Sequence, residues 1–151
     1  MAHIHFAASS EARDRIIRLG EDPSSTHLVG CPRIDSVSEV IKDARIFLRL
    51  KDLVAGQGVG SPIDLDRPFI VFSLHPVTTE YDRNEEHVRE SILALRDIDI
   101  QVIVLWPNSD AGSNKVSREL RKWRESGVSK SVRFFKNFPV DCYMALLART
   151  S

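Results

Sequence analysis

Three short apolar runs alternate with three helical patterns in the second half of the chain, and this alternation constrains the fold most. The predicted strands are 69–74, 100–106 and 132–135, and the predicted helices are 84–96, 113–126 and 139–149. Apolar strands joined by helices form a parallel sheet with helices on both faces. The sequence therefore predicts an α/β fold that contains half of a doubly wound, Rossmann-like sheet.

The first part of the chain predicts a smaller unit. Residues 3–8 alternate as a strand does, and residues 10–19 carry an apolar stripe at helical spacing, with Ser10 as the N-cap and Gly20 as the stop. A further helix is predicted over 35–53, followed by a loop over 55–68 that is rich in glycine and proline. We expect three segments: 1–30, a connecting segment 31–68, and the sheet domain 69–151.

Composition excludes several classes of function. Acidic and basic residues number 21 each, so the net charge favours neither nucleic acid nor an acidic membrane as a partner. The sequence contains no apolar run of about 20 residues and no signal peptide, which predicts a cytoplasmic location. Cys31 and Cys142 lack metal-ligand spacing, and His3 and His5 share a strand face without an evident third ligand, so we predict no metal site.

Polar side chains follow two of the predicted strands at the point where each strand ends. The run 69–74 leads into HPVTTE, and the run 100–106 leads into PNSDAGS. In open α/β sheets, ligands bind outside the carboxyl ends of the strands. Two such ends from neighbouring strands predict a binding site at one edge of the sheet.

Four sequence blocks resemble a known family. LVGCPRID (28–35), SLHPVTTE (73–80), VLWPNSDAGS (104–113) and the opening HIHFAAS with RLGEDP are similar to successive blocks of UDP-N-acetylglucosamine 2-epimerases. The hydrolysing branch of the sialic-acid pathway resembles the chain best. The resemblance implies two Rossmann-like domains in the glycosyltransferase-B arrangement, with the UDP-sugar bound between them, no cofactor, and a homodimer.

The resemblance covers only the middle of the longer family members. It implies that residues 1–30 are the βα end of the N-terminal domain and that 69–151 begin the C-terminal domain. The family's catalytic carboxylates would lie upstream and its Gly-Asn-Ser-Ser nucleotide block downstream, so we expect a partial enzyme that is inactive alone. The alternative is a non-catalytic module that binds UDP or a nucleotide sugar, or that assembles through sheet edges at Phe69 or Val132. N-acetylglucosamine and diacetamido sugars both remain open as substrates.

The family reaction implies a role for one histidine. UDP leaves as the proton on C2 of the sugar is removed, and water then adds to give N-acetylmannosamine. A cation or proton donor is needed at the leaving phosphate, and a histidine, with an ordinary pKa of about 6.5, suits this need. We predict that His75 is this catalytic residue; the alternative is a histidine that only ends a strand.

Other residues of the same blocks are predicted to contact the substrate. Thr78 and Thr79 offer hydroxyl groups, Asn108 offers an amide for the uracil or ribose, and Asp110 is either a ligand contact or a turn residue. Ser113 is predicted to cap the helix that follows.

The helix over 113–126 carries a row of basic residues. The simplest interpretation is a solvated face. In animal relatives, however, a feedback nucleotide sugar lies near this helix, and Arg118 and Arg121 resemble the arginines there. These two residues are therefore a candidate regulatory anion site. The GxG of Gly58 and Gly60 follows no strand and precedes no lysine, so we do not expect it to bind phosphate.

Overall fold

A computed structural model describes residues 2–76, 78–108, 112–127 and 131–150 of the chain. The chain forms two compact units, Met1–Lys42 and Asp43–Ser151. The boundary lies inside the predicted connecting segment 31–68.

The first unit contains a two-stranded parallel sheet with a helix. Strands β1 (His5–Ala7) and β2 (Thr26–Leu28) pair in parallel, and helix α1 (Ser10–Arg18) connects them, followed by the short 3-10 helix η1 (Pro23–Ser25). The predicted N-cap of α1 is wrong by one residue. Ser9 has extended backbone dihedrals, and its hydroxyl accepts a hydrogen bond from the backbone N–H of Ala12 at 3.2 Å.

The single helix predicted over 35–53 is wrong, because the chain forms two helices there. Helix α2 (Pro32–Lys42) ends immediately before Asp43, and α3 (Ala44–Gly56) begins after it. Asp43 has an extended backbone, and its carboxylate accepts a hydrogen bond from the backbone N–H of Arg45 at 2.9 Å. An aspartate that caps a new helix in this way cannot continue the preceding one.

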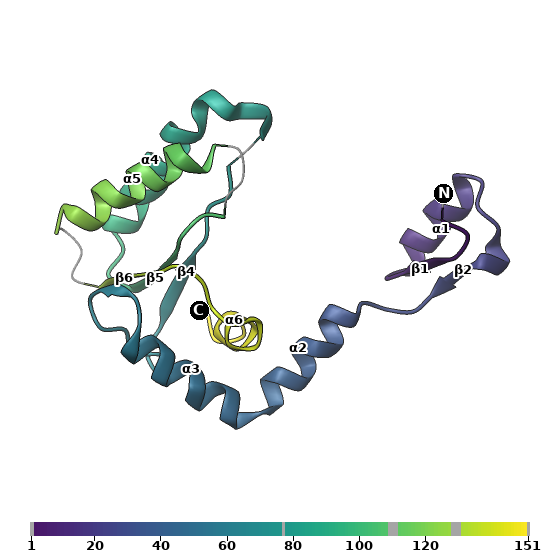
Figure 1. The fold of residues 1–151 in the computed structure, drawn as a ribbon, viewed down its shortest axis with the longest axis horizontal. Coiled ribbons are helices and arrows are strands. Elements are labelled where there is room, and N and C mark those ends of the chain that lie inside the picture. Colours follow the sequence, from purple (N-terminus) through teal and green to yellow (C-terminus); the bar gives the residue numbers. More distant parts are fainter. Residues whose placement is uncertain (1, 77, 109–111, 128–130, 151) are drawn as a thin grey trace. The chain divides into compact units, whose positions relative to one another are not determined.

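The second unit is the predicted α/β sheet (Figure 1). Strands β4 (Phe69–Phe72), β5 (Gln101–Leu105) and β6 (Val132–Phe135) are parallel, and the sheet order is β3-β6-β5-β4. Helices α4 (Asn84–Arg96) and α5 (Ser113–Glu125) pack against each other on one face, while α3 and α6 (Val140–Leu147) pack together on the other. The 3-10 helix η2 (Thr78–Arg83) precedes α4. Helices thus cover both faces, as expected.

Part of the predicted loop 55–68 is a strand. Strand β3 (Val59–Gly60) pairs antiparallel with β6, so the Val132 edge that we expected to be unpaired has a neighbour. The Arg133 side chain donates hydrogen bonds to the carbonyl oxygens of Ala55 at 3.3 Å and Gln57 at 2.7 Å. It thereby ties the end of α3 to β6, where a cation complements the helix dipole.

The core lies between the sheet and the α4–α5 pair. It contains Val88, Ile92, Val102, Val104, Val116, Leu120, Trp123, Val132 and Phe134. Cys142 is buried on the other face, and burial raises the pKa of its thiol. Among the described residues, no helix combines the length and apolar character that crossing a membrane requires.

Candidate functional site

A cavity of about 250 Å³ lies at the carboxyl ends of the three parallel strands. We call it the strand-end cavity; its described lining is Ser73, His75, Leu105, Trp106, Asn108, Lys136, Asn137, Phe138 and Tyr143. His75 follows β4, Asn108 follows β5 and Lys136 follows β6 directly. Parallel strands end at the same sheet edge, so residues about thirty positions apart meet in one cavity.

The strand order places the end of β4 at the position where such sheets bind ligands. In a doubly wound sheet the first three strands lie in the order 3-2-1, and the crevice opens beside strand 1. Here β4 corresponds to strand 1, since β5 and β6 lie successively to one side of it. Within the described part of the chain, β5 is the only strand that pairs with β4. His75 therefore follows the strand beside which sheets of this kind bind ligands.

The charge of the strand-end cavity suits an anion. His75 and Lys136 line it, both are exposed, and its described lining includes no carboxylate. The Asn108 and Asn137 amides supply neutral donors and acceptors, and the half-buried Tyr143 supplies an aromatic ring and a hydroxyl. Such a lining can bind a phosphate group and a planar ring. No carboxylate that could remove a proton from carbon is among these described lining residues.

Comparison with known proteins identifies the family. The family model described as UDP-N-acetylglucosamine 2-epimerase matches residues 1–151. The chain belongs to this family. The resemblance noted in the four sequence blocks is thus confirmed, and the α/β architecture agrees with it.

Similar proteins come from three bacteria. The chain is 28% identical over 123 residues to a UDP-N,N′-diacetylbacillosamine 2-epimerase (hydrolyzing) of Legionella pneumophila, covering 82% of this chain and 30% of the relative. It is 25% identical over 136 residues to a UDP-N-acetylglucosamine 2-epimerase of Neisseria meningitidis, covering 89% and 33%. It is 22% identical over 148 residues to a GDP/UDP-N,N′-diacetylbacillosamine 2-epimerase (hydrolyzing) of Campylobacter jejuni, covering 97% and 36%. The chain spans about a third of these relatives.

The strand-end cavity of this 2-epimerase family member brings together two of the predicted site residues. His75 and Asn108 both line it, whereas Thr79 is exposed on η2 and is not among its described lining residues. Asp110 and the side chain of Thr78 lie outside the described residues. The roles assigned to all of these residues stay predictions.

Four lining residues of this cavity lie outside the four sequence blocks. Lys136, Asn137 and Phe138 follow β6, and Tyr143 lies on α6. Ligands bind outside the carboxyl ends of all parallel strands, β6 included, so the sequence could have predicted Lys136 as a site residue. Tyr143 could not be predicted, because its position depends on how α6 returns across the sheet.

A second cavity, of about 500 Å³, lies beside the start of α5, and we call it the helix-start cavity. Arg118 and Arg121 both line it, together with Asn108 and Ser113. Ser113 does not cap the helix as predicted: Gly112 occupies the N-cap with φ of 93°, and Ser113 is the first helical residue. Its hydroxyl is buried and has no hydrogen-bond partner among the residues that the structure describes.

Arg118 is already engaged in an ion-pair network between α4 and α5. Its guanidinium lies 2.7 Å from the Glu85 carboxylate. Arg89 bridges Glu85 and Glu119, and Lys122 lies 2.6 Å from Glu119. Arg118 and Lys122, on the basic face of α5, therefore pair with carboxylates and help to hold α4 and α5 together. Among the described residues, no group of three or more His, Cys, Asp or Glu side chains could hold a metal ion.

Proposed function

We propose that this chain forms one wall of the UDP-sugar site of a hydrolysing UDP-N-acetylglucosamine 2-epimerase. One observation supports the proposal most. In a member of this family, His75 and Asn108 come from the ends of two adjacent parallel strands and line the same cavity. The relatives from Legionella and Campylobacter are named as hydrolyzing enzymes, which supports the hydrolysing assignment.

The cavity suits the leaving group of the reaction. When the C1–O bond of the UDP-sugar breaks and the C2 proton leaves, negative charge grows on the diphosphate. His75, when protonated, would donate a proton or a hydrogen bond to the leaving phosphate oxygen, and the Lys136 ammonium would offset the remaining charge. Asn108 would bind the uracil or ribose, and the Tyr143 ring would stack on the base. Water then adds to the unsaturated sugar to give N-acetylmannosamine.

The base for the C2 proton is not expected from this wall. No carboxylate is among the described lining residues, and the volume of about 250 Å³ lies below the roughly 300–1,000 Å³ typical of complete small-molecule sites. A complete UDP-sugar site therefore needs a second wall that supplies the base. We infer that the isolated chain binds UDP but does not turn over UDP-N-acetylglucosamine.

Calorimetric titration with UDP tests the proposal. We expect the chain to bind UDP, and Asn108→Ala and Tyr143→Ala each to weaken binding about tenfold, because each would remove a direct contact with the nucleoside. Asn114→Ala is the matched control, since this exposed amide lines the helix-start cavity but is not among the described lining residues of the strand-end cavity. An absence of UDP binding, or equal losses in Asn108→Ala and Asn114→Ala, would contradict the proposal.

Several parts of the proposal come from the sequence and the family resemblance. These are a place in sialic-acid biosynthesis, a homodimer, a cytoplasmic location, and contacts from Thr78, Thr79 and Asp110 to the substrate. The regulatory role of Arg118 and Arg121 belongs with them. That role requires Arg118 to share its guanidinium between Glu85 and an effector.

A further inference from the structure

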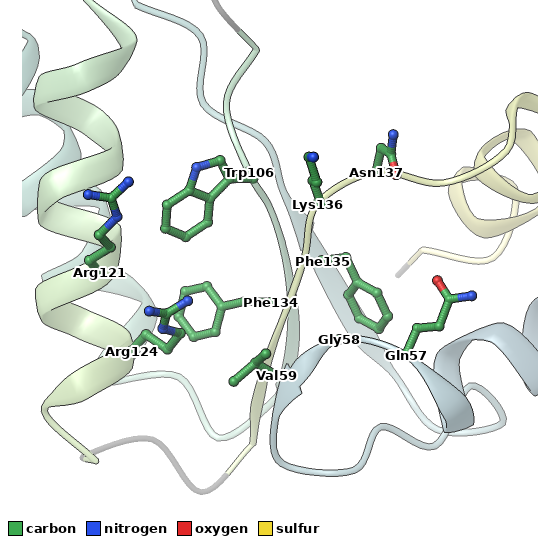
Figure 2. A pocket seen from close by; sticks show the side chains of 10 residues that line it. All are labelled: Gln57, Gly58, Val59, Trp106, Arg121, Arg124, Phe134, Phe135, Lys136 and Asn137. Carbon is green, nitrogen blue, oxygen red and sulfur yellow. The ribbon is translucent and has the colours of Figure 1, made fainter.

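A third pocket, of about 480 Å³, lies where α5, β6 and the β3 segment meet, and we call it the edge pocket (Figure 2). Arg121 and Arg124 line it from α5, Phe134 lines it from β6, and Trp106 lines it from the end of β5. Trp106, Lys136 and Asn137 also line the strand-end cavity, whereas His75 and Asn108 are not among the described lining residues of the edge pocket. Its volume lies within the range of pockets that bind small molecules.

The edge pocket is strongly cationic. Arg121, Arg124 and Lys136 line it, all three are exposed, and no carboxylate is among its described lining residues. The structure gives Arg124 one acidic neighbour, the exposed Glu125 at 3.6 Å. Within the described residues, Arg121 and Lys136 form no ion pair within 4.0 Å. Three cations with one exposed counter-charge favour a ligand that carries two negative charges.

Arg121 and Arg124 also make cation–π contacts with an aromatic ring. The Trp106 ring centroid lies 5.9 Å from the Arg121 guanidinium carbon and 5.8 Å from that of Arg124. Figure 2 shows the Trp106 and Phe134 rings on the side of β6 that faces α5, next to both arginines. A cation–π contact leaves the outer N–H groups of a guanidinium available to an anion. A ligand with a planar ring and an anionic group could therefore contact the aromatic rings and the arginines at the same time.

We propose that the edge pocket binds an aryl phosphomonoester, with the ring against Trp106 and Phe134 and the phosphate between Arg121 and Arg124. Arginine suits a phosphate because its N–H groups bind two oxygens at once. The pocket shares Arg121 and Trp106 with the helix-start cavity. It differs from that cavity in Arg124 and Phe134, whereas Arg118 lines only the helix-start cavity among the described residues. The proposal does not depend on UDP binding at the strand-end cavity.

Calorimetric titration of the 151-residue chain with 4-nitrophenyl phosphate tests this site. We expect Arg121→Gln and Arg124→Gln each to raise the Kd at least about tenfold, because each removes charge-assisted hydrogen bonds. Arg96→Gln is the matched control: it removes the same charge from α4, away from the edge pocket, and should change the Kd less than about twofold. Circular dichroism establishes that each variant is folded.

Two further measurements locate the ligand and test the need for a ring. Asn108→Ala, at the strand-end cavity, should leave the Kd unchanged. Trp106→Leu should weaken 4-nitrophenyl phosphate to the level of inorganic phosphate, which itself should bind at least about tenfold more weakly than the ester. The proposal is overturned by an absence of binding, by equal losses in Arg96→Gln and Arg124→Gln, by a loss in Asn108→Ala, or by inorganic phosphate that binds as tightly as the ester.

Discussion

Replacing Gly60 by alanine should destabilise the second unit, because the backbone there leaves no room for a side chain. Gly60 has φ of 125°, and a Cβ atom at this position would lie 2.3 Å from the carbonyl oxygen of Val132. That oxygen also accepts the backbone hydrogen bond of Ser61 at 3.0 Å. An alanine must therefore push β3 away from β6 or change the backbone conformation.

The size of the loss follows from these contacts. A non-glycine residue in a sparsely populated backbone region costs about 1–3 kcal/mol. Breaking the Ser61 hydrogen bond adds about 0.5–1.5 kcal/mol. We therefore expect Gly60→Ala to lower the free energy of unfolding by about 2–4 kcal/mol, and the melting temperature by roughly 4–8 °C for each kcal/mol.

Urea unfolding followed by tryptophan fluorescence measures this change, and Gly56→Ala is the control. Gly56 is the last residue of α3, and a Cβ there would meet nothing within 4 Å. Alanine favours helix over glycine by up to about 1 kcal/mol, so Gly56→Ala should be neutral or stabilising. If Gly60→Ala unfolded at the same urea concentration as the original chain, β3 would not pair with β6 in this register.

Two further substitutions test buried polar contacts. Burial alone would raise the pKa of Glu119, but hydrogen bonds from Arg89 and Lys122 outweigh it and hold that pKa below its ordinary value of 4.5. Glu119→Gln should therefore cost about 1 kcal/mol at neutral pH, and chemical unfolding at several pH values should show this difference disappearing as the pH falls below 4.5. Gln101→Leu should cost about 2–3 kcal/mol, because the buried amide accepts from the Asp64 N–H at 2.7 Å and donates to its carbonyl at 3.0 Å. Gln57→Leu, at an exposed position, should change the midpoint of thermal unfolding little.

Helices and strands with strong local patterns could be predicted from the sequence. Helix α4 and strand β6 have the predicted bounds, 84–96 and 132–135. In α4, Val88 and Ile92 recur at helical spacing and are both buried. In β6, Val132 and Phe134 face the α5 side of the sheet as the period of two requires. In these elements the spacing of the buried residues and the local preference indicate the same secondary structure, so the sequence predicts it without ambiguity.

Elements that depend on a single backbone contact could not be predicted. The apolar spacing of 35–53 runs through Asp43 without interruption, yet the carboxylate of Asp43 caps a new helix and separates α2 from α3. Strand β3 has two residues and no buried side chain, so it leaves no periodic signal. It exists because Gly60 permits a close approach to β6, more than seventy positions later in the chain. Such a partner is specified by the fold rather than by the local sequence.

The candidate site shows why a rule about strand ends reveals only part of a binding surface. The rule placed His75 and Asn108 together because it follows from parallel pairing, and it would have added Lys136 at the end of β6. It cannot reach Tyr143, which enters the cavity from α6 after the chain crosses to the other face of the sheet. The described lining residues at the three strand ends include no carboxylate. If the base for a carbon-acid reaction at this surface is a carboxylate, it would therefore come from other residues than these.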